Sequence, residues 1–99
     1  MNYSEYMKSL TFEKVPTELS VFLQAMWLEA KGKWEQAHSL VEHDSTQHGA
    51  WIHAYLHRVE GDKWNAGYWY RRAAKPFPSV SQKEEWAQIV TELLQYEQG

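Results

Sequence analysis

The chain has 99 residues, 15% of them aromatic, which suits one small domain whose core is built from a few large side chains. Without cysteine it has no disulfides, thiolate nucleophiles or cysteine-ligated metal centres, and without a secretory leader or a membrane-length apolar run it is expected in the cytoplasm. The net charge of −3 argues against nucleic acid, although residues 50–75 carry five Lys or Arg against two acids and favour an anionic ligand or an acidic partner.

The first part of the chain predicts a lead-in followed by two helices. Residues 1–16 include a short helix, because their apolar side chains have helical spacing. Apolar residues recur at intervals of three and four over 17–31, with Thr17 as the capping residue, and again over 33–43 after Gly32. We expect the apolar residues of the lead-in to fold back over the helix at 17–31; these are Tyr3, Tyr6, Met7, Leu10 and Phe12.

Three further helices are predicted. The helix at 48–60 ends at Gly61, and the next helix covers 62–75, since Pro76 cannot continue it. Ser81 opens a capping box that starts the last helix, at 81–97. No alternating strand pattern occurs, so the chain is expected to be all-α. Its last helix should have a polar outer side made of Gln82, Lys83, Glu85, Gln88 and Glu92, and the helix at 33–43 should have one packed face made of Trp34, Ala37, His38 and Val41.

Two short segments repeat 29 residues apart, at 30–37 (AKGKWEQA) and 59–66 (VEGDKWNA). In each, glycine is expected to close a helix where a positive φ is needed, and alanine five residues later lets two helices approach closely. The segments predict a first hairpin at 17–43 and a second at 48–75 within a single domain.

The second hairpin carries a glycine–aspartate turn followed by small, aromatic, small and proline positions: Gly61, Asp62, Ala66, Tyr70, Ala73 and Pro78. This pattern resembles a tetratricopeptide repeat over residues 47–78, and its second helix is similar to the related Sel-one-like repeat. Over 18–46 the pattern is degenerate, and the residues that fit it are Ala25, Gly32, Trp34 and Ala37. The resemblance implies tetratricopeptide-like antiparallel hairpins in a right-handed array, a C-terminal capping helix at 81–97, and a protein-binding scaffold.

Two histidines in the second hairpin raise the question of a metal site. His53 and His57 are four residues apart and lie on one helix face, as two metal ligands would. A third ligand is needed, and the nearest candidates in sequence, Glu60 and His43, form no recognised spacing with them. We therefore expect no metal and no cofactor, and interpret the pair as hydrogen-bonded histidines between the helices of the hairpin.

If the hairpin pairs as predicted, the same histidines face its second helix, whose side chains suit an anionic or aromatic ligand. No catalytic residue is expected, since the chain has no nucleophile elbow and no phosphate-binding loop. The candidate ligand- or partner-binding residues are His53, His57, Asn65, Trp69, Tyr70 and Arg72.

Two functions remain open. The first is a protein-interaction module whose aromatic and basic residues bind another protein or a second copy of the chain, as in a homodimer. The alternative is a protein that binds a small molecule or an anion, including an unusual enzyme. Neither nucleic acid nor membrane is an expected partner.

Overall fold

The computed structural model describes residues 1–98, which fold into six helices without a strand, so the all-α prediction is confirmed. No helix in this range is both long and apolar enough to cross a membrane. The helices are α1 (Tyr3–Ser9), α2 (Val21–Ala30), α3 (Trp34–Val41), α4 (Gln47–Glu60), α5 (Lys63–Arg72) and α6 (Gln82–Gln98).

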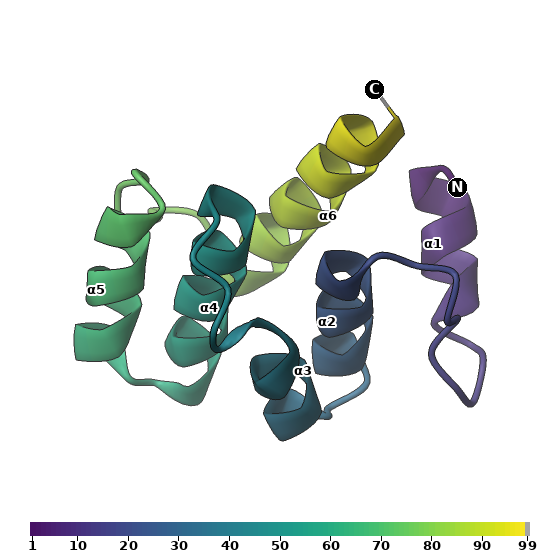
Figure 1. The fold of residues 1–99 in the computed structure, drawn as a ribbon, viewed down its shortest axis with the longest axis horizontal. Helices are drawn as coiled ribbons and strands as arrows, with labels where there is room; N and C mark the ends of the chain where they lie inside the picture. The colour runs from purple at the N-terminus through teal and green to yellow at the C-terminus, as the bar shows by residue number, and fades with distance from the viewer. Residues whose placement is uncertain (99) are drawn as a thin grey trace.

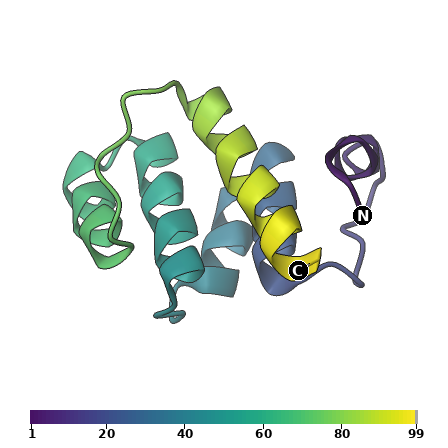
Figure 2. The same cartoon turned by 90° about the horizontal axis from the view of Figure 1, so that it is seen from above.

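Consecutive helices pack in pairs, α2 against α3 and α4 against α5, and α3 also contacts α4 (Figure 1). Helix α6 runs across this array and contacts α4, α2 and α1 (Figure 2). Helix α5 lies at one end, and α4 is its only close backbone neighbour among the described helices. One side of α5 is therefore left without a covering helix.

Two predicted helix boundaries differ from the structure by three or more residues. Helix α2 begins at Val21 instead of residue 17, because Ser20 is its capping residue and its Oγ accepts from the Leu23 amide at 3.2 Å. Residues 16–19 form a turn instead, closed by a 3.3 Å bond from the amide of Leu19 to the carbonyl of Pro16. Helix α5 ends at Arg72 instead of residue 75, because the chain leaves the helical conformation at Ala74, which has a positive φ.

Three helices end in the same way, with a residue of positive φ. The φ angles are 80° at Gly32, 87° at Gly61 and 57° at Ala74. After α5, the amide of Lys75 bonds to the carbonyl of Tyr70 at 3.0 Å, which is the six-to-one bond of a Schellman motif. The two glycines have the role predicted for them, whereas at residue 74 an alanine takes the position that favours glycine.

The lead-in folds back on the rest of the chain through α1. Tyr6 is fully buried and its hydroxyl donates to the carbonyl of Leu23 at 2.6 Å. Trp27 on α2 donates its indole N–H to the carbonyl of Ser9 at 3.2 Å, and the rings of Tyr6 and Trp86 lie 6.1 Å apart. Helix α1 thus covers α2, as predicted, and also contacts α6. Of the five apolar residues named for this role, Tyr6 is buried and Leu10 is half-buried, whereas Tyr3, Met7 and Phe12 are exposed.

Helix α6 differs from the prediction at Glu85. The sequence analysis placed this residue on the polar outer side, but it is 1% exposed. Glu85 lies one turn before Ile89 and two turns before Leu93, so it belongs to the buried face of α6. The other apolar residues of that face, Trp86 and Val90, are also buried.

Candidate functional site

Three imidazoles meet where α3 packs beside α4: His38 from α3, and His53 and His57 from α4. We call them the histidine cluster. Nε2 of His38 lies 3.0 Å from Nε2 of His53, and the rings of His53 and His57 are 4.9 Å apart. One nitrogen from each of the three side chains lies within 4.8 Å of the others. The spacing of four residues brings the two histidines of α4 together, and the packing of α3 supplies the third.

Two tryptophans hold the rings of the cluster in place. Trp34, one turn before His38 on α3, stacks on its imidazole with 4.9 Å between centroids. Trp69 on α5 stacks on His53 at 4.0 Å and 15°. Since the indole of Trp34 also donates to the carbonyl of Leu56 at 2.7 Å, α3 is tied to α4 beside the cluster.

Burial keeps the innermost imidazole neutral. His53 is 4% exposed, and this burial, together with the charges of His38 and His57, lowers its pKa to about 4. Burial and the neighbouring His57 also lower the pKa of His38. Among the described residues, the Nδ1 atom of His53 has no hydrogen-bond partner. Neutral imidazoles are the form in which histidine binds transition metals.

A carboxylate lies near Nδ1 of each of the two more exposed histidines of the cluster, His57 and His38. Nδ1 of His57 lies 2.6 Å from Oε2 of Glu60, and Nδ1 of His38 lies 3.6 Å from Oε2 of Glu42. The side chains of His57 and His38 are 12% and 22% exposed, so this edge of the cluster reaches solvent.

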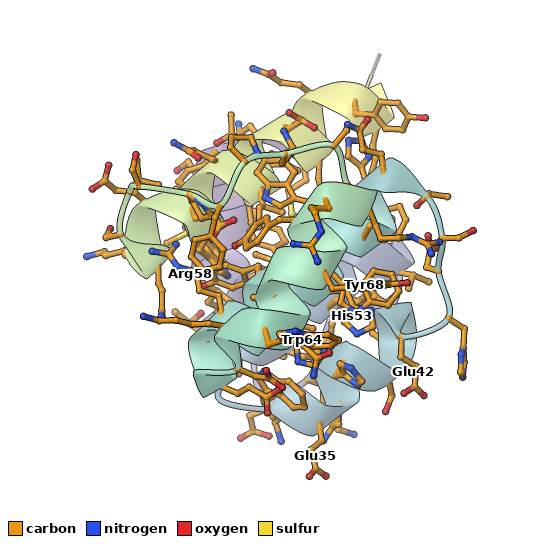
Figure 3. All side chains as sticks on the ribbon, turned by 90° about the vertical axis from the view of Figure 1, so that its left-hand side faces the viewer. Glu35, Glu42, His53, Arg58, Trp64 and Tyr68 are labelled. Atoms are coloured by element: carbon orange, nitrogen blue, oxygen red, sulfur yellow. The ribbon has the colours of Figure 1, made fainter. Side chains whose placement is uncertain are left out.

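The uncovered side of α5 forms a second feature, which we call the α5 outer face. Trp64 is 76% exposed, and Tyr68, one turn later, is 37% exposed. Figure 3 views the molecule from this side and labels Trp64 and Tyr68 on α5, with His53 nearby. All the exposed side chains lie on one half of the helix circumference, opposite the buried Ala66 and Tyr70; the face consists of Lys63, Trp64, Tyr68, Arg71 and Arg72.

The six residues proposed from the sequence are divided between several places. His53, His57 and Trp69 come together in the histidine cluster. Arg72 belongs to the α5 outer face, where its guanidinium lies 5.9 Å from the ring of Tyr68 and 5.5 Å from that of Trp69. Asn65 serves the start of α5, because its Nδ2 donates to Oδ2 of Asp62 at 2.6 Å.

Tyr70 lies apart from the histidines, in a buried polar group centred on Glu85. That carboxylate accepts from the Tyr70 hydroxyl at 2.7 Å, from the Trp51 indole at 3.0 Å and from Arg58 at 2.9 Å. In Figure 3, Arg58 and His53 are labelled on opposite sides of α5. A hydroxyl bonded to Glu85 has no access to a ligand at the histidine cluster, and burial raises the pKa of Tyr70 above its usual value.

A groove of about 580 Å³ lies on the same side of the molecule as Glu85, between the start of α6 and the segment 75–80. Lys75 sits in it with its ammonium 3.9 Å from the ring centre of Trp51. None of the six residues proposed from the sequence lines this groove.

Sequence reasoning missed one residue that these features depend on. His38 was assigned to the packed face of its helix, and the third partner of His53 and His57 was sought at Glu60 and His43. The signal available in the sequence was the position of His38 one turn after Trp34, since an imidazole on a packed face requires a polar partner from another helix. Trp64 is among the aromatic residues that the interaction-module hypothesis considers for partner binding, and the structure leaves it exposed.

Comparisons of the chain with family models, with curated proteins and with solved structures give no significant match.

Proposed function

We propose that the chain is a small cytoplasmic, tetratricopeptide-like interaction module, and that its α5 outer face binds an acidic segment of another protein. The observation that carries the proposal is Trp64, whose side chain is 76% exposed on a helix whose only close backbone neighbour among the described helices is α4. Tryptophan, tyrosine and arginine are the residues that contribute most often to binding energy at protein interfaces.

Charge indicates the kind of partner. Lys63, Arg71 and Arg72 are exposed on this face, and residues 63–75 contain no acidic side chain. Complementary charge speeds association and excludes partners of the wrong sign. A segment rich in Asp or Glu therefore fits this face better than a neutral or basic one.

The middle of the face also suits close contact with another chain. Gly67 lies between Trp64 and Arg71 on the helix surface, and a Cβ at this position would meet only Nη1 of Arg71, at 3.6 Å. Folding therefore does not require glycine here, where it costs about 1 kcal/mol relative to alanine. The missing side chain leaves room for a partner to approach the helix backbone.

Two features support the tetratricopeptide-like arrangement within this proposal. The helix pairs α2/α3 and α4/α5 each turn at a glycine of positive φ, and these glycines lie 29 residues apart. Ala37 and Ala66, which follow them at equal distance, are both fully buried where the paired helices meet.

The experiment is site-directed photo-crosslinking in the cells that make the protein. A photoreactive residue at position 64 should form an adduct with another protein through a segment rich in acidic residues. The same residue at position 12 is the control, because Phe12 is also exposed but lies in the loop after α1. A crosslink between two copies of the chain, or one to a segment poor in acids, would contradict the proposal.

The contact segment is then tested as a purified peptide. Changing Arg71 and Arg72 together to Glu should weaken its binding at least tenfold, whereas changing Lys8 and Lys14 to Glu should alter it less than twofold. Both pairs are exposed and give the same change in net charge. Equal effects of the two double variants on peptide binding would overturn the assignment of the binding site to the α5 outer face.

A further inference from the structure

We propose that His38, His53 and His57 bind one divalent transition-metal ion, Zn²⁺ in the cell, through one ring nitrogen each. The site is separate from the α5 outer face and does not depend on partner binding. Three imidazoles are the protein ligands of an open tetrahedral zinc site, whose fourth position holds water or an outside ligand. The third ligand, which residue spacing did not identify, is His38 on α3.

The distances are close to those that coordination requires. With Zn–N bonds of 2.0–2.1 Å, two nitrogens of a tetrahedral site lie about 3.4 Å apart. The Nε2 atoms of His38 and His53 are 3.0 Å apart, and all three nitrogens lie within 4.8 Å. The nitrogen–nitrogen separations therefore exceed the tetrahedral value by at most about 1.4 Å, and small rotations of the partly exposed His38 and His57 can close that gap.

The surroundings of His57 orient its ring as in known zinc sites. Metal-bound histidines commonly donate their second ring N–H to a carboxylate. Glu60 lies 2.6 Å from Nδ1 of His57, within hydrogen-bond distance, whereas Glu42 lies 3.6 Å from Nδ1 of His38, at the distance of an ion pair. The bond to Glu60 leaves Nε2 of His57 for the ion. Nε2 of His38 already lies beside Nε2 of His53, and the stacking of Trp69 fixes the ring of His53.

A purely structural role leaves His53 unexplained. Within residues 1–98 its Nε2 has another imidazole as its hydrogen-bond partner and its Nδ1 has none, although the residue is 4% exposed. Buried polar atoms without partners cost free energy, and an apolar side chain stacked on Trp69 would avoid that cost. Coordination of a metal ion through Nε2 accounts for an imidazole at this position in spite of the cost that falls on Nδ1.

A competing ligand set shares His57 and is less suitable. Ligand atoms of His57, Glu60 and Asp62 also lie within 4.8 Å of one another. Both carboxylate oxygens of Asp62, however, already accept from Asn65, one from its amide at 3.2 Å and one from its side chain at 2.6 Å. Asp62 caps α5, so metal binding there would disrupt the start of that helix.

The experiment titrates the untagged, chelator-treated protein with Zn²⁺ against a chromophoric chelator. One equivalent should bind, and Co²⁺ should give the visible bands of a four-coordinate ion. His38→Gln and His57→Gln should weaken Zn²⁺ binding at least 100-fold. His43→Gln is the control, since that side chain is 93% exposed and lies outside the cluster; it should change binding less than twofold.

Two further measurements keep the outcome decisive. Imidazole NMR signals of the unaltered protein should shift on Zn²⁺ addition for His38, His53 and His57 and stay in place for His43, which avoids any variant that fails to fold. Glu60→Gln should weaken binding 10- to 100-fold, as loss of an orienting carboxylate does. The proposal is overturned if the protein does not bind one equivalent of Zn²⁺ or if His38→Gln binds Zn²⁺ normally. It is also overturned if Asp62→Asn weakens Zn²⁺ binding more than the histidine variants do.

Discussion

The hydroxyl of Tyr70 on α5 lies 2.8 and 2.7 Å from the two carboxylate oxygens of Glu85 on α6, and both side chains are 1% exposed. The same carboxylate pairs with Arg58 on α4, which also donates to the carbonyl of Val80 at 2.6 Å. One buried carboxylate therefore connects three helices and the segment that joins α5 to α6.

Replacing Glu85 should be strongly destabilising. Glu85→Ala leaves the guanidinium of Arg58 in a largely buried place without its counter-ion, and should lower the free energy of unfolding by about 3 to 5 kcal/mol. Tyr70→Phe removes one donor and should cost about 1 to 2 kcal/mol. Urea denaturation gives both values. The exposed Glu84→Ala is the matched control, with an expected cost below about 1 kcal/mol, and a similar cost for Glu85→Ala would contradict this account.

The end of α5 offers a stabilising substitution. Ala74 has a φ of 57°, where glycine is free of the strain that a Cβ causes. Ala74→Gly should raise the free energy of unfolding by about 0.5 to 1 kcal/mol, since the relief of strain exceeds the added entropy of the unfolded chain. The neighbouring Ala73 has a φ of −82° and is buried, so Ala73→Gly should lower stability by about 1 to 2 kcal/mol. Thermal unfolding of the two variants should move in opposite directions.

Alkaline pH should unfold the protein through its buried phenols. Burial raises the pKa values of Tyr6, Tyr55 and Tyr70 above the ordinary value of 10.0. The unfolded chain then loses these protons first, so stability is unaffected below about pH 10 and falls above it. Each phenol contributes up to about 1.4 kcal/mol per pH unit to this loss.

The alkaline prediction is checked by urea unfolding between pH 8 and pH 11.5, the range that brackets the ordinary tyrosine value. The tyrosinate absorbance contributed by these three buried phenols should rise together with the loss of helix. Tyr6→Phe should reduce the slope of stability against pH, because one of the three titrating phenols is gone. Stability that remains constant through this whole range would refute the prediction.

The packing of α1 should depend on a single aromatic side chain. Tyr6 is fully buried and bonds to the carbonyl of Leu23, whereas Tyr3 on the same helix is 37% exposed. Tyr6→Ala should therefore lower stability by about 3 to 5 kcal/mol, and Tyr3→Ala by less than about 1 kcal/mol. Deletion of residues 1–12 should lower the melting temperature at least as much as Tyr6→Ala. A truncated chain that keeps its melting temperature and only changes its sedimentation would show that α1 is an oligomer contact.

Local periodicity was sufficient to predict the helices. The apolar spacing within each segment and the glycines at 32 and 61 depend on residues only a few positions apart, which sequence shows directly. Ala66, Tyr70 and Ala73, which have helical spacing, are all buried. The helix ends were less certain because a hydroxyl at residue 17 and one at residue 20 look equally able to cap α2.

Contacts between helices could not be predicted in the same way. The pairing of His38 with His53 joins residues 15 positions apart on different helices, and no local pattern specifies how α3 lies against α4. Glu85 was misplaced for a related reason: a carboxylate on an apolar face is costly, so its sequence position alone suggests solvent. Only the arrangement of Trp51, Arg58 and Tyr70 around it makes burial favourable.

The contact between Tyr6 and Trp86 joins helices whose residues lie 80 positions apart in the chain. At ribosomal speeds of 5–20 residues per second, α6 is synthesised about 4 to 16 seconds after α1. During that interval the apolar sides of α1 and α2 have no α6 to cover them. The nascent chain is then a target for chaperones that bind exposed apolar segments, and it escapes them only after α6 has left the exit tunnel.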